Sequence, residues 1–242
     1  MTTLLTITRY PKYMGLFGFL SMAIFRLPLW MNKKISFWKL MGCGKNGTFD
    51  IHPDWRQWAM IAVSHEPSAI SSQLSAKNKK QETRNKELYG SFITAWLKFF
   101  RCEILTYLLE PIEGHGKWDG KEVFGPLPKQ TDYDGIIAVL TRATIRLSRV
   151  KSFWKNVSPV VAQMAVAPGF ISSIGIGEMP FIKQATFSIW ESKDHVKQFA
   201  YGMQQHKNVV QKTRQEKWYS EDMFVRFRVI DTVGSIKGMR KY

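Results

Sequence analysis

Histidine is the residue type in this chain best suited to chemistry near neutral pH, because imidazole can act as an acid, a base or a metal ligand. The sequence contains His52, His65, His115, His195 and His206. None of them lies in the spacing His-Glu-x-x-His or His-x-Glu, and the chain contains no Cys-x-x-Cys or Gly-x-Ser-x-Gly sequence. These absences argue against a zinc hydrolase, a nucleobase deaminase and a serine hydrolase.

His206 lies in a segment, residues 194–214, whose apolar residues recur at helical spacing. At about 100° per residue, four side chains fall within about 60° of it on the helix: Phe199, Met203, Val210 and Thr213. A histidine in such an apolar stripe is commonly a core residue satisfied by one hydrogen bond. The alternative is an axial ligand to a haem iron, because a neutral imidazole on an apolar helical face is a usual proximal ligand.

His195 lies near the start of the same predicted helix, where exposure to solvent is expected, and is the second candidate ligand. Three arginines could pair with the carboxylates of a haem: Arg142, Arg214 and Arg226. Exposed arginines are common, so each is equally consistent with a plain surface residue. Cys43 and Cys102 are too few for a disulfide framework or a cysteine-only zinc site, which leaves a reducing compartment as the default.

An internal repeat organises the elements that would position these residues. Four segments recur in the same order, and the matched pairs are 8–9 with 141–142, 37–44 with 170–177, 58–63 with 184–189, and 116–120 with 234–238. The first two pairs share an offset of 133 residues. The conserved order indicates a duplication with roughly 120–130 residues in each copy.

Both copies predict the same string of elements, β-α-β-β-α-β. In the first copy the ranges are 4–10, 14–30, 36–44, 57–64, 84–102 and 103–110. In the second copy they are 136–143, 150–166, 169–177, 184–190, 193–215 and 223–231. The Gly-x-Gly sequences at 42–44 and 175–177 lead from strand to strand and do not open a helix. We therefore interpret them as turn or bulge glycines and not as a phosphate-binding loop.

The string is the ferredoxin-like split unit, an antiparallel sheet with helices on one face only. Two such units can close by packing their open faces together. The sequence thus predicts an α+β fold in which two tandem ferredoxin-like units form a fused dimeric α+β barrel with an apolar interior. We expect the first unit at 1–125 and the second, haem-binding unit at 134–242, with the turn-rich segment 126–133 between them.

The strongly apolar stretch Met14–Trp30 raises the question of a membrane. It approaches the roughly 17–25 residues of a spanning helix, but Arg26 and Pro28 interrupt it. No small-x-small cleavage site follows, which argues against a cleaved signal peptide. We interpret the stretch as a buried amphipathic helix, next to which Trp30, Lys33 and Lys34 allow contact with a lipid interface.

The chain carries a large positive charge, with 35 Lys and Arg against 19 Asp and Glu, a net charge of +16 and a pI of about 9.9. Such an excess points to an anionic partner, either nucleic acid or a membrane surface. No nucleic-acid-binding module is recognised, which argues against nucleic acid. Basic residues concentrate at 77–86, 142–155 and 237–241, and we interpret them as a means of docking on anionic headgroups.

Several segments of the chain together resemble the spheroidene monooxygenase family, the bacterial carotenoid 2-ketolases. In the second half they are 140–146, 167–170, 175–180, 184–190, 199–201, His206, 213–214, 218–219 and 221–227. In the first half they are 37–44 and 53–63. The resemblance covers nearly the whole chain and is denser after residue 136.

The resemblance implies a haem-dependent oxygenase, unrelated to the cytochromes P450, that inserts oxygen at C-2 of an acyclic carotenoid. It implies O₂ as co-substrate and an electron donor such as ferredoxin. His206 matches the family's Phe-Ala-Tyr-x4-His position and becomes the expected proximal ligand of haem b, with His195 as the runner-up. The residues expected beside the haem are Phe199, Met203, Val210 and Arg214. Arg142 and Trp190 are the expected further catalytic residues, on strands that could face the substrate.

Two other functions remain open from the residues. One is a haem enzyme of the same fold with different chemistry, such as a dehydratase or a peroxidase. The other is a non-enzymatic protein that binds an apolar ligand or a membrane surface. For the oxygenase, we expect a cytoplasmic protein that associates peripherally with the inner membrane surface, because its substrate dissolves only in a bilayer. Its oligomeric state is left open.

Overall fold

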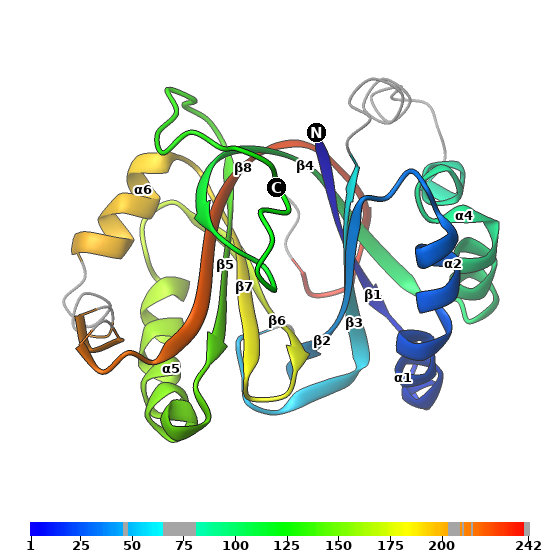
Figure 1. The fold of residues 1–242 in the computed structure, drawn as a ribbon. Coiled ribbons are helices and arrows are strands. Elements are labelled where there is room, and N and C mark those ends of the chain that lie inside the picture. Colours follow the sequence, from blue (N-terminus) through cyan, green and yellow to red (C-terminus); the bar gives the residue numbers. More distant parts are fainter. Residues whose placement is uncertain (46–47, 65–80, 203–208, 210, 214, 240–242) are drawn as a thin grey trace. The chain divides into compact units, whose positions relative to one another are not determined.

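The computed structural model describes residues 1–45, 48–64, 81–202, 209, 211–213 and 215–239 of the 242-residue chain. Figure 1 shows the chain as a ribbon. The elements of its first half are β1 (Thr2–Arg9), α1 (Gly15–Ile24), α2 (Arg26–Met31), β2 (Phe37–Gly44), β3 (Pro53–Ser64), α4 (Gln81–Phe99) and β4 (Glu103–Gly116). Those of its second half are β5 (Ile137–Ile145), α5 (Val150–Ala165), β6 (Phe170–Met179), β7 (Lys183–Trp190), α6 (Lys193–Lys197) and β8 (Tyr219–Ser235).

Both halves have the element order β-α-β-β-α-β, counting α1 and α2 as one helical stretch. The hydrogen-bonded order of the strands is β1-β3-β2-β6-β7-β5-β8-β4, which closes as a barrel. The strand pairs of β1 with β3 and β4, and of β7 with β5 and β6, are antiparallel. The predicted fold class, a duplicated ferredoxin-like α+β barrel, is confirmed.

The chain divides into two compact units, and the last strand of each half contributes to both. The first unit holds Met1–Gly42, Asp54–Glu110 and Val229–Lys241. The second holds Cys43–Pro53 and Pro111–Arg228. The end of β4 thus belongs to the second unit and the end of β8 to the first. The duplication boundaries at 125 and 134 stay a prediction about the origin of the chain.

In the first unit, α1, α2 and α4 cover one face of the sheet (Figure 1). Leu4 of β1 packs there in a cluster with Phe25, Leu29 and Ile93 from the helices. Leu5 and Ile7 alternate with Leu4 along the strand, so they point to the other face, and they are fully buried as well. Because both faces of β1 are covered, its sequence TTLLTITR lacks the apolar–polar alternation of a half-exposed strand.

In the second unit, α5 and α6 cover one face of the sheet formed by β5, β7 and their neighbours (Figure 1). Two apolar clusters fill the space between helices and strands. One joins Ile137 and Trp190 of the strands to Met164 of α5 and Val196 of α6. The other places Trp218 with Ile145, Phe153 and Val157.

Three predicted elements are corrected by the structure. The helix expected at 14–30 is divided at Phe25 into α1 and α2, and only one of its faces is buried. Gly114-His115-Gly116 lies in β4 and not in a turn, because strand pairing extends to Gly116. The helix expected at 193–215 is α-helical over Lys193–Lys197 and then forms a π-helical turn, Gln198–Gly202. A wider turn changes the angular spacing along the helix, so α-helical periodicity does not carry through it.

No helix within the described ranges is long and apolar enough to cross a membrane.

The repeated glycines Gly116 and Gly120, and their partners Gly234 and Gly238, occupy equivalent places after the last strand of each half. All four have positive φ, at +91°, +76°, +85° and +86°, a conformation that glycine adopts at little cost. The same turn thus follows β4 and β8, which supports the inferred duplication.

The Gly-x-Gly sequences lie within β2 and β6, as expected for structural glycines. Gly175 lies against the backbone of residues 48–49: a Cβ atom there would be 2.5 Å from the Cα atom of Phe49 and 2.7 Å from the carbonyl oxygen of Thr48. At Gly42 the nearest atom to an added Cβ is a ring carbon of Trp58, 3.7 Å away. The two glycines therefore differ in the room they have for a side chain.

We predict that Gly175→Ala lowers the free energy of unfolding by about 1–3 kcal/mol, because backbone must move to admit the methyl group. Gly42→Ala, which adds the same methyl group at ordinary contact distance, should change it by less than about 0.5 kcal/mol. Urea unfolding followed by circular dichroism measures both. Equal effects of the two substitutions would contradict the close approach at Gly175.

Candidate active site

The predicted site residues on the strands of the second unit lie on opposite faces of its sheet. In the ladder between β5 and β7, Ile137 is aligned with Trp190 and Arg142 with Ala185. Ile137 and Arg142 are five residues apart on one strand, so their side chains point to opposite faces. Trp190 shares the face of Ile137, which the helices cover, and Arg142 lies on the other face. Arg142 and Trp190 therefore belong to two separate environments.

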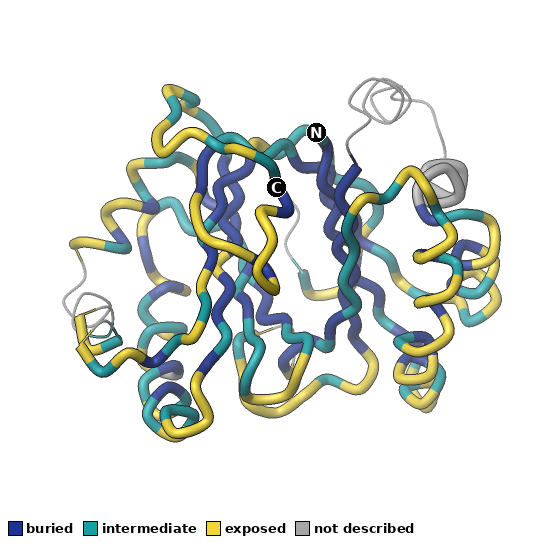
Figure 2. Tube along the Cα trace, viewed as in Figure 1, coloured by how far each residue is buried: buried dark blue, intermediate teal, exposed yellow. Residues whose placement is uncertain are grey.

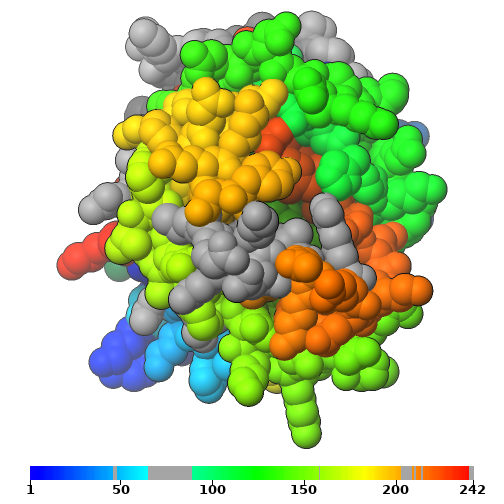
Figure 3. All heavy atoms as spheres, turned by 90° about the vertical axis from the view of Figure 1, so that its left-hand side faces the viewer, coloured from blue at the N-terminus to red at the C-terminus, as the bar shows by residue number. Residues whose placement is uncertain are grey.

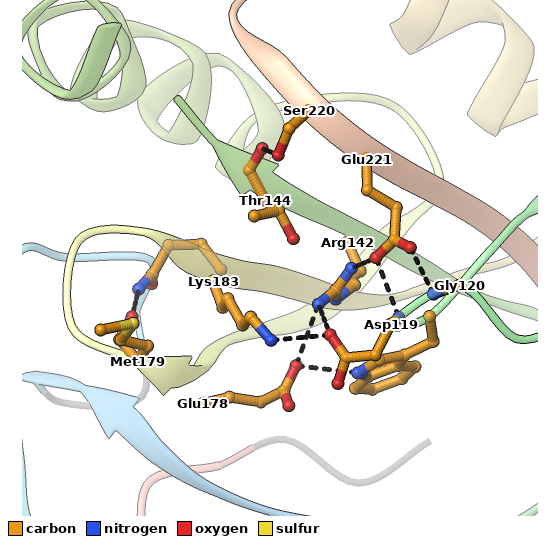
Figure 4. A network of polar contacts seen from close by, with 11 residues as sticks. Asp119, Gly120, Arg142, Thr144, Glu178, Met179, Lys183, Ser220 and Glu221 are labelled. Carbon is orange, nitrogen blue, oxygen red and sulfur yellow. Dashed lines mark hydrogen bonds and ion pairs between the residues drawn. The ribbon is translucent and has the colours of Figure 1, made fainter. Parts of the chain in front are cut away.

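Arg142 is buried, with 1% of its side chain exposed, and is held by three carboxylates (Figure 4). Its guanidinium donates to Asp119 at 3.0 Å and to Glu178 at 3.3 Å, and it makes a close ion pair with Glu221. Lys183 adds a second positive charge through an ion pair of 2.7 Å with Asp119. Three carboxylates facing two cations satisfy the charge that burial of a guanidinium requires.

Trp118 completes this group, which we call the Arg142 cluster: Trp118, Asp119, Arg142, Glu178, Lys183 and Glu221. The indole N–H donates to Glu178 at 2.8 Å, and the guanidinium lies 5.4 Å from the centre of the indole ring. An arginine over a tryptophan ring gains a cation–π attraction in addition to its ion pairs. The carboxylates and the ring thus surround the guanidinium and fix its position.

Glu221 joins the Arg142 cluster to the turn after β4. Its two carboxylate oxygens accept the backbone N–H groups of Asp119 at 2.9 Å and Gly120 at 2.7 Å. Partial burial raises the pKa of the Glu221 carboxyl. The hydrogen bonds from Gly120, Asp119 and Arg142 outweigh burial, and together they hold this pKa below its usual value of 4.5.

The first unit contains the counterpart of this arrangement at the positions matched by the repeat. Arg9, which matches Arg142, donates at 2.6 Å to the carbonyl oxygen of Lys237, in the turn after β8. The N–H of Lys237 donates to Glu103 at 3.1 Å. Arg9 also donates twice to the side-chain oxygen of Gln57, at 2.6 and 2.9 Å. In both units an arginine and a glutamate therefore hold the turn that follows the last strand of the other half.

This correspondence indicates that Arg142 is a structural clamp. Both terminal nitrogens of its guanidinium bind carboxylates, so they have no donor left over for a substrate or cofactor without breaking an ion pair. The assignment of Arg142 to catalysis stays a prediction, and the geometry gives it no support. The signal that could have found the clamp in the sequence is the match of Thr8-Arg9 with Thr141-Arg142.

The helix-covered face of the sheet brings together two other predicted residues, Trp190 and Phe199. Their rings are 5.2 Å apart between centroids, and Phe170 lies 5.3 Å from the Trp190 ring on another side. Trp190 is 2% exposed and its indole N–H donates to the hydroxyl of Ser188 at 2.9 Å. Trp190 and Phe199 thus form the aromatic part of a dry cluster between sheet and helices.

A second set of buried charges borders this aromatic cluster. Val139 is aligned with Arg226 in the ladder between β5 and β8, so Arg226 lies on the same face as Trp190. Arg226 makes a close ion pair with the buried Glu113, and Glu113 lies 3.0 Å from Lys193 at the start of α6. The Nε atom of Arg226 is buried and has no hydrogen-bond partner among the described residues. An acceptor placed there would satisfy it.

The second candidate ligand, His195, is half-buried at the start of α6. Its Nδ1 atom lies 3.0 Å from the hydroxyl of Ser192, which caps the helix by accepting the backbone N–H of His195. Figure 3 shows α6 and the following turn, in gold, at the surface of the second unit. The predicted residues His206, Met203, Val210 and Arg214 lie outside the described residues, so their predicted roles stay predictions.

The described residues offer little other chemistry for a metal or a nucleophile. No group of three or more His, Cys, Asp or Glu side chains within the described ranges could hold a metal ion. Burial raises the pKa of the Cys102 thiol to about 12, so this thiol is protonated at neutral pH.

A pocket of about 230 Å³ lies beside the end of β4, lined by residues that include His115, Glu122, Phe124 and Met223. Its volume is below the roughly 300–1,000 Å³ of typical small-molecule sites. It could admit the end of a long apolar molecule but not a whole carotenoid or a haem. Sequence reasoning did not single out Glu122 or Phe124, because they lie in a stretch without periodicity.

The helix-covered face fits a haem better than the face of Arg142 does. A haem is a flat apolar ring with two carboxylates, and this face offers aromatic side chains at Trp190 and Phe199 and a buried guanidinium nitrogen at Arg226 that still needs an acceptor. The described residues of this face are therefore compatible with the predicted cofactor.

The architecture is similar to that of a solved aldoxime dehydratase. The two structures superpose with a TM-score of 0.60 at 8% sequence identity, over 97% of this chain and 84% of the other. At such low identity the likeness shows the fold alone, a dimeric α+β barrel. No family model matches the chain.

The sequence itself is similar to two characterised relatives. Spheroidene monooxygenase of Cereibacter sphaeroides is 33% identical over 207 residues, which are 85% of this chain and 59% of that protein. Spheroidene monooxygenase of Rhodobacter capsulatus is 31% identical over 220 residues, 90% of this chain and 85% of that protein. The chain belongs to the spheroidene monooxygenase family, as its motifs predicted. It spans about three fifths of the length of the Cereibacter relative.

We predict that Arg142→Ala lowers the free energy of unfolding by about 3–5 kcal/mol, because three carboxylates lose the cation that compensates them. Arg9→Ala is the matched control: its main side-chain partner, Gln57, is uncharged, so the loss should be about 1–2 kcal/mol. Urea unfolding at neutral pH compares the two. A larger loss for Arg9→Ala would contradict the account of the Arg142 cluster.

The lowered pKa of Glu221 predicts a pH dependence of stability. A carboxyl with a depressed pKa in the folded protein stabilises it above the unfolded pKa, about 4.5, and this contribution is lost as the pH falls through the folded value. The stability difference between the native chain and Glu221→Gln should therefore be largest near neutral pH and shrink below about pH 4.5. Thermal melting across the acid range measures it; a constant difference would refute the assignment.

Proposed function

We propose that the protein is a haem-dependent monooxygenase that hydroxylates or ketolates an acyclic carotenoid-type substrate with O₂. The observation that carries the proposal is membership of the spheroidene monooxygenase family, at 31% identity over 90% of the chain and 85% of the Rhodobacter relative. Each turnover would convert a C–H bond to C–OH and release water, at the cost of one O₂, two electrons and two protons. A reduced protein such as ferredoxin would supply the electrons.

A second oxidation at the same carbon would give a geminal diol, which loses water to form a ketone. The family's named members are monooxygenases, which are oxidoreductases. Bound haem would supply the activation of O₂, for which no side chain of the chain is suited.

We propose His206 as the axial ligand, with Phe199, Met203 and Val210 against the macrocycle. Trp190 would close the same apolar space, since it contacts Phe199. Arg214, and with it Arg226, would pair with the carboxylates, and Arg226 has the buried nitrogen available for this. These residues would exclude water and orient the substrate, which are the contributions a protein makes to cofactor chemistry.

A long apolar substrate dissolves in a lipid bilayer and not in water. We therefore propose that the protein works at an anionic membrane surface, to which its net charge of +16 is attracted.

The competing function is a dehydratase, favoured by the fold shared with aldoxime dehydratase. A dehydration needs no O₂, so products formed under strict exclusion of O₂ would support it and contradict the monooxygenase.

We predict that the protein, expressed with sufficient haem, shows a Soret absorption band, and that His206→Ala shifts or abolishes this band because the iron loses its axial nitrogen. His195→Ala is the matched control on the same segment and should leave the band unchanged. Absorption spectra of the three purified proteins test this without any substrate. A Soret band that is identical in His206→Ala would overturn ligation by His206.

A further inference from the structure

The helices α1 and α2 are apolar on both sides. Gly18 and Ser21 of α1, and Leu29 of α2, point into the first unit and are buried. On the solvent side, large apolar side chains are exposed, and we call these the outer face: Leu16, Phe19, Leu20, Ile24, Leu27, Trp30 and Met31. A helix that is apolar all round is normally buried all round, so a surface position leaves one side without its usual environment.

The outer face is one continuous stripe. Its residues are separated by three or four positions, and at about 100° per residue they fall within an arc of about 140°. Their exposed fractions run from 37% for Ile24 to 76% for Trp30. Figure 2 shows α1 and α2 with their exposed residues in yellow. A stripe of this width and exposure is far more than the scattered apolar residues of an ordinary surface.

Side chains beyond the two helices extend the outer face. Trp55 of β3 is 59% exposed, and its ring lies 6.1 Å from that of Phe19. Tyr13 and Met14, just before α1, are exposed as well. Tyrosine and tryptophan are the side chains that favour the boundary between water and lipid, because each has an apolar ring and one polar group.

The charge around the outer face has a single sign. Residues 1–49 contain no Asp or Glu, while Lys12, Arg26, Lys33 and Lys34 are exposed next to or within the helices. Long basic side chains can keep their charge in water while their stems lie along an apolar surface. A surface with an apolar stripe and basic residues at both ends combines the two features of an interfacial helix.

We propose that the outer face docks the protein on an anionic lipid bilayer, with α1 and α2 lying in the plane of the interface. This names the surface for the membrane association in the proposed function, and it rests on that function only for the reason a bilayer is needed. The apolar stripe would lie among the acyl chains near the headgroups. Lys12, Lys33 and Lys34 would lie at the level of the anionic headgroups.

A second copy of this chain fits the outer face less well. Symmetric pairing would bring the same patch together with itself, so the basic residues of both copies would face one another without an acidic partner from residues 1–49. An anionic bilayer accepts the apolar side chains and the charges at once.

Flotation of the purified full-length chain with vesicles tests the proposal, using phosphatidylcholine alone or mixed with phosphatidylglycerol. The native protein should float with the mixed vesicles and bind less as salt rises. Leu27→Gln/Trp30→Gln, whose targets are 62% and 76% exposed, should lower the affinity at least about tenfold. Leu147→Gln/Val166→Gln is the matched control in the second unit, at 77% and 79% exposure, and should bind as the native protein does.

Lys33→Gln/Lys34→Gln examines the electrostatic part separately. It should lower the affinity for mixed vesicles by about fivefold per lysine and flatten the salt dependence, with little effect on phosphatidylcholine alone. Thermal melting confirms that each variant is folded, since all the substituted side chains are exposed.

Unchanged vesicle binding by Leu27→Gln/Trp30→Gln would overturn the proposal. So would a native dimer that this variant converts to a monomer, which would assign the outer face to a second copy, or binding to an acidic protein lost in the variant while vesicle binding persists. The vesicles contain neither haem nor carotenoid. Failure of the Soret test with intact vesicle binding therefore contradicts the proposed chemistry alone, and the reverse result contradicts only the docking surface.

Discussion

The buried guanidinium of Arg142 is the interaction on which the second unit depends. A cation with 1% of its side chain exposed is tolerable only where its counter-charges are fixed, and the turn after β4 supplies one of them through Asp119. The same turn is held by Glu221, so the start of β8, the end of the first half and the middle of β5 meet at one point. The end of β4 is thereby anchored in the second unit, and the sheet face with the aromatic cluster keeps its shape.

The duplication explains why this clamp exists twice and why its copies differ. Arg9 and Arg142 occupy matched positions, and each binds the turn that follows the last strand of the other half. In the first unit the partners of the arginine are an amide and a carbonyl; in the second they are carboxylates. The halves have also diverged in use: the helices of the first unit present an apolar outer face, and those of the second cover the candidate haem site.

The repeat in the sequence predicted the element order and the fold class, because strand and helix periodicities are local and were present twice. The same reasoning failed where a non-local pairing decided the outcome. Gly114-His115-Gly116 reads locally as a turn, but strand pairing extends β4 to Gly116. The candidate Arg142 was grouped with Trp190 from the resemblance, yet the register of β5 against β7 puts them on opposite faces. The π-helical turn at Gln198–Gly202 was likewise invisible to a count made at α-helical spacing.

By itself, the sequence determined the family, the duplicated β-α-β-β-α-β order and the positive charge, because motifs, periodicity and composition are properties of the chain. Only the tertiary structure decided which face each strand residue takes, that Arg142 is enclosed by carboxylates from three separate segments, and that Arg226 keeps a buried nitrogen without a partner on the described haem-side face. It also decided that α1 and α2 expose half of their apolar surface. Burial and ion pairing depend on segments distant in the sequence, and no local pattern encodes which of them will meet.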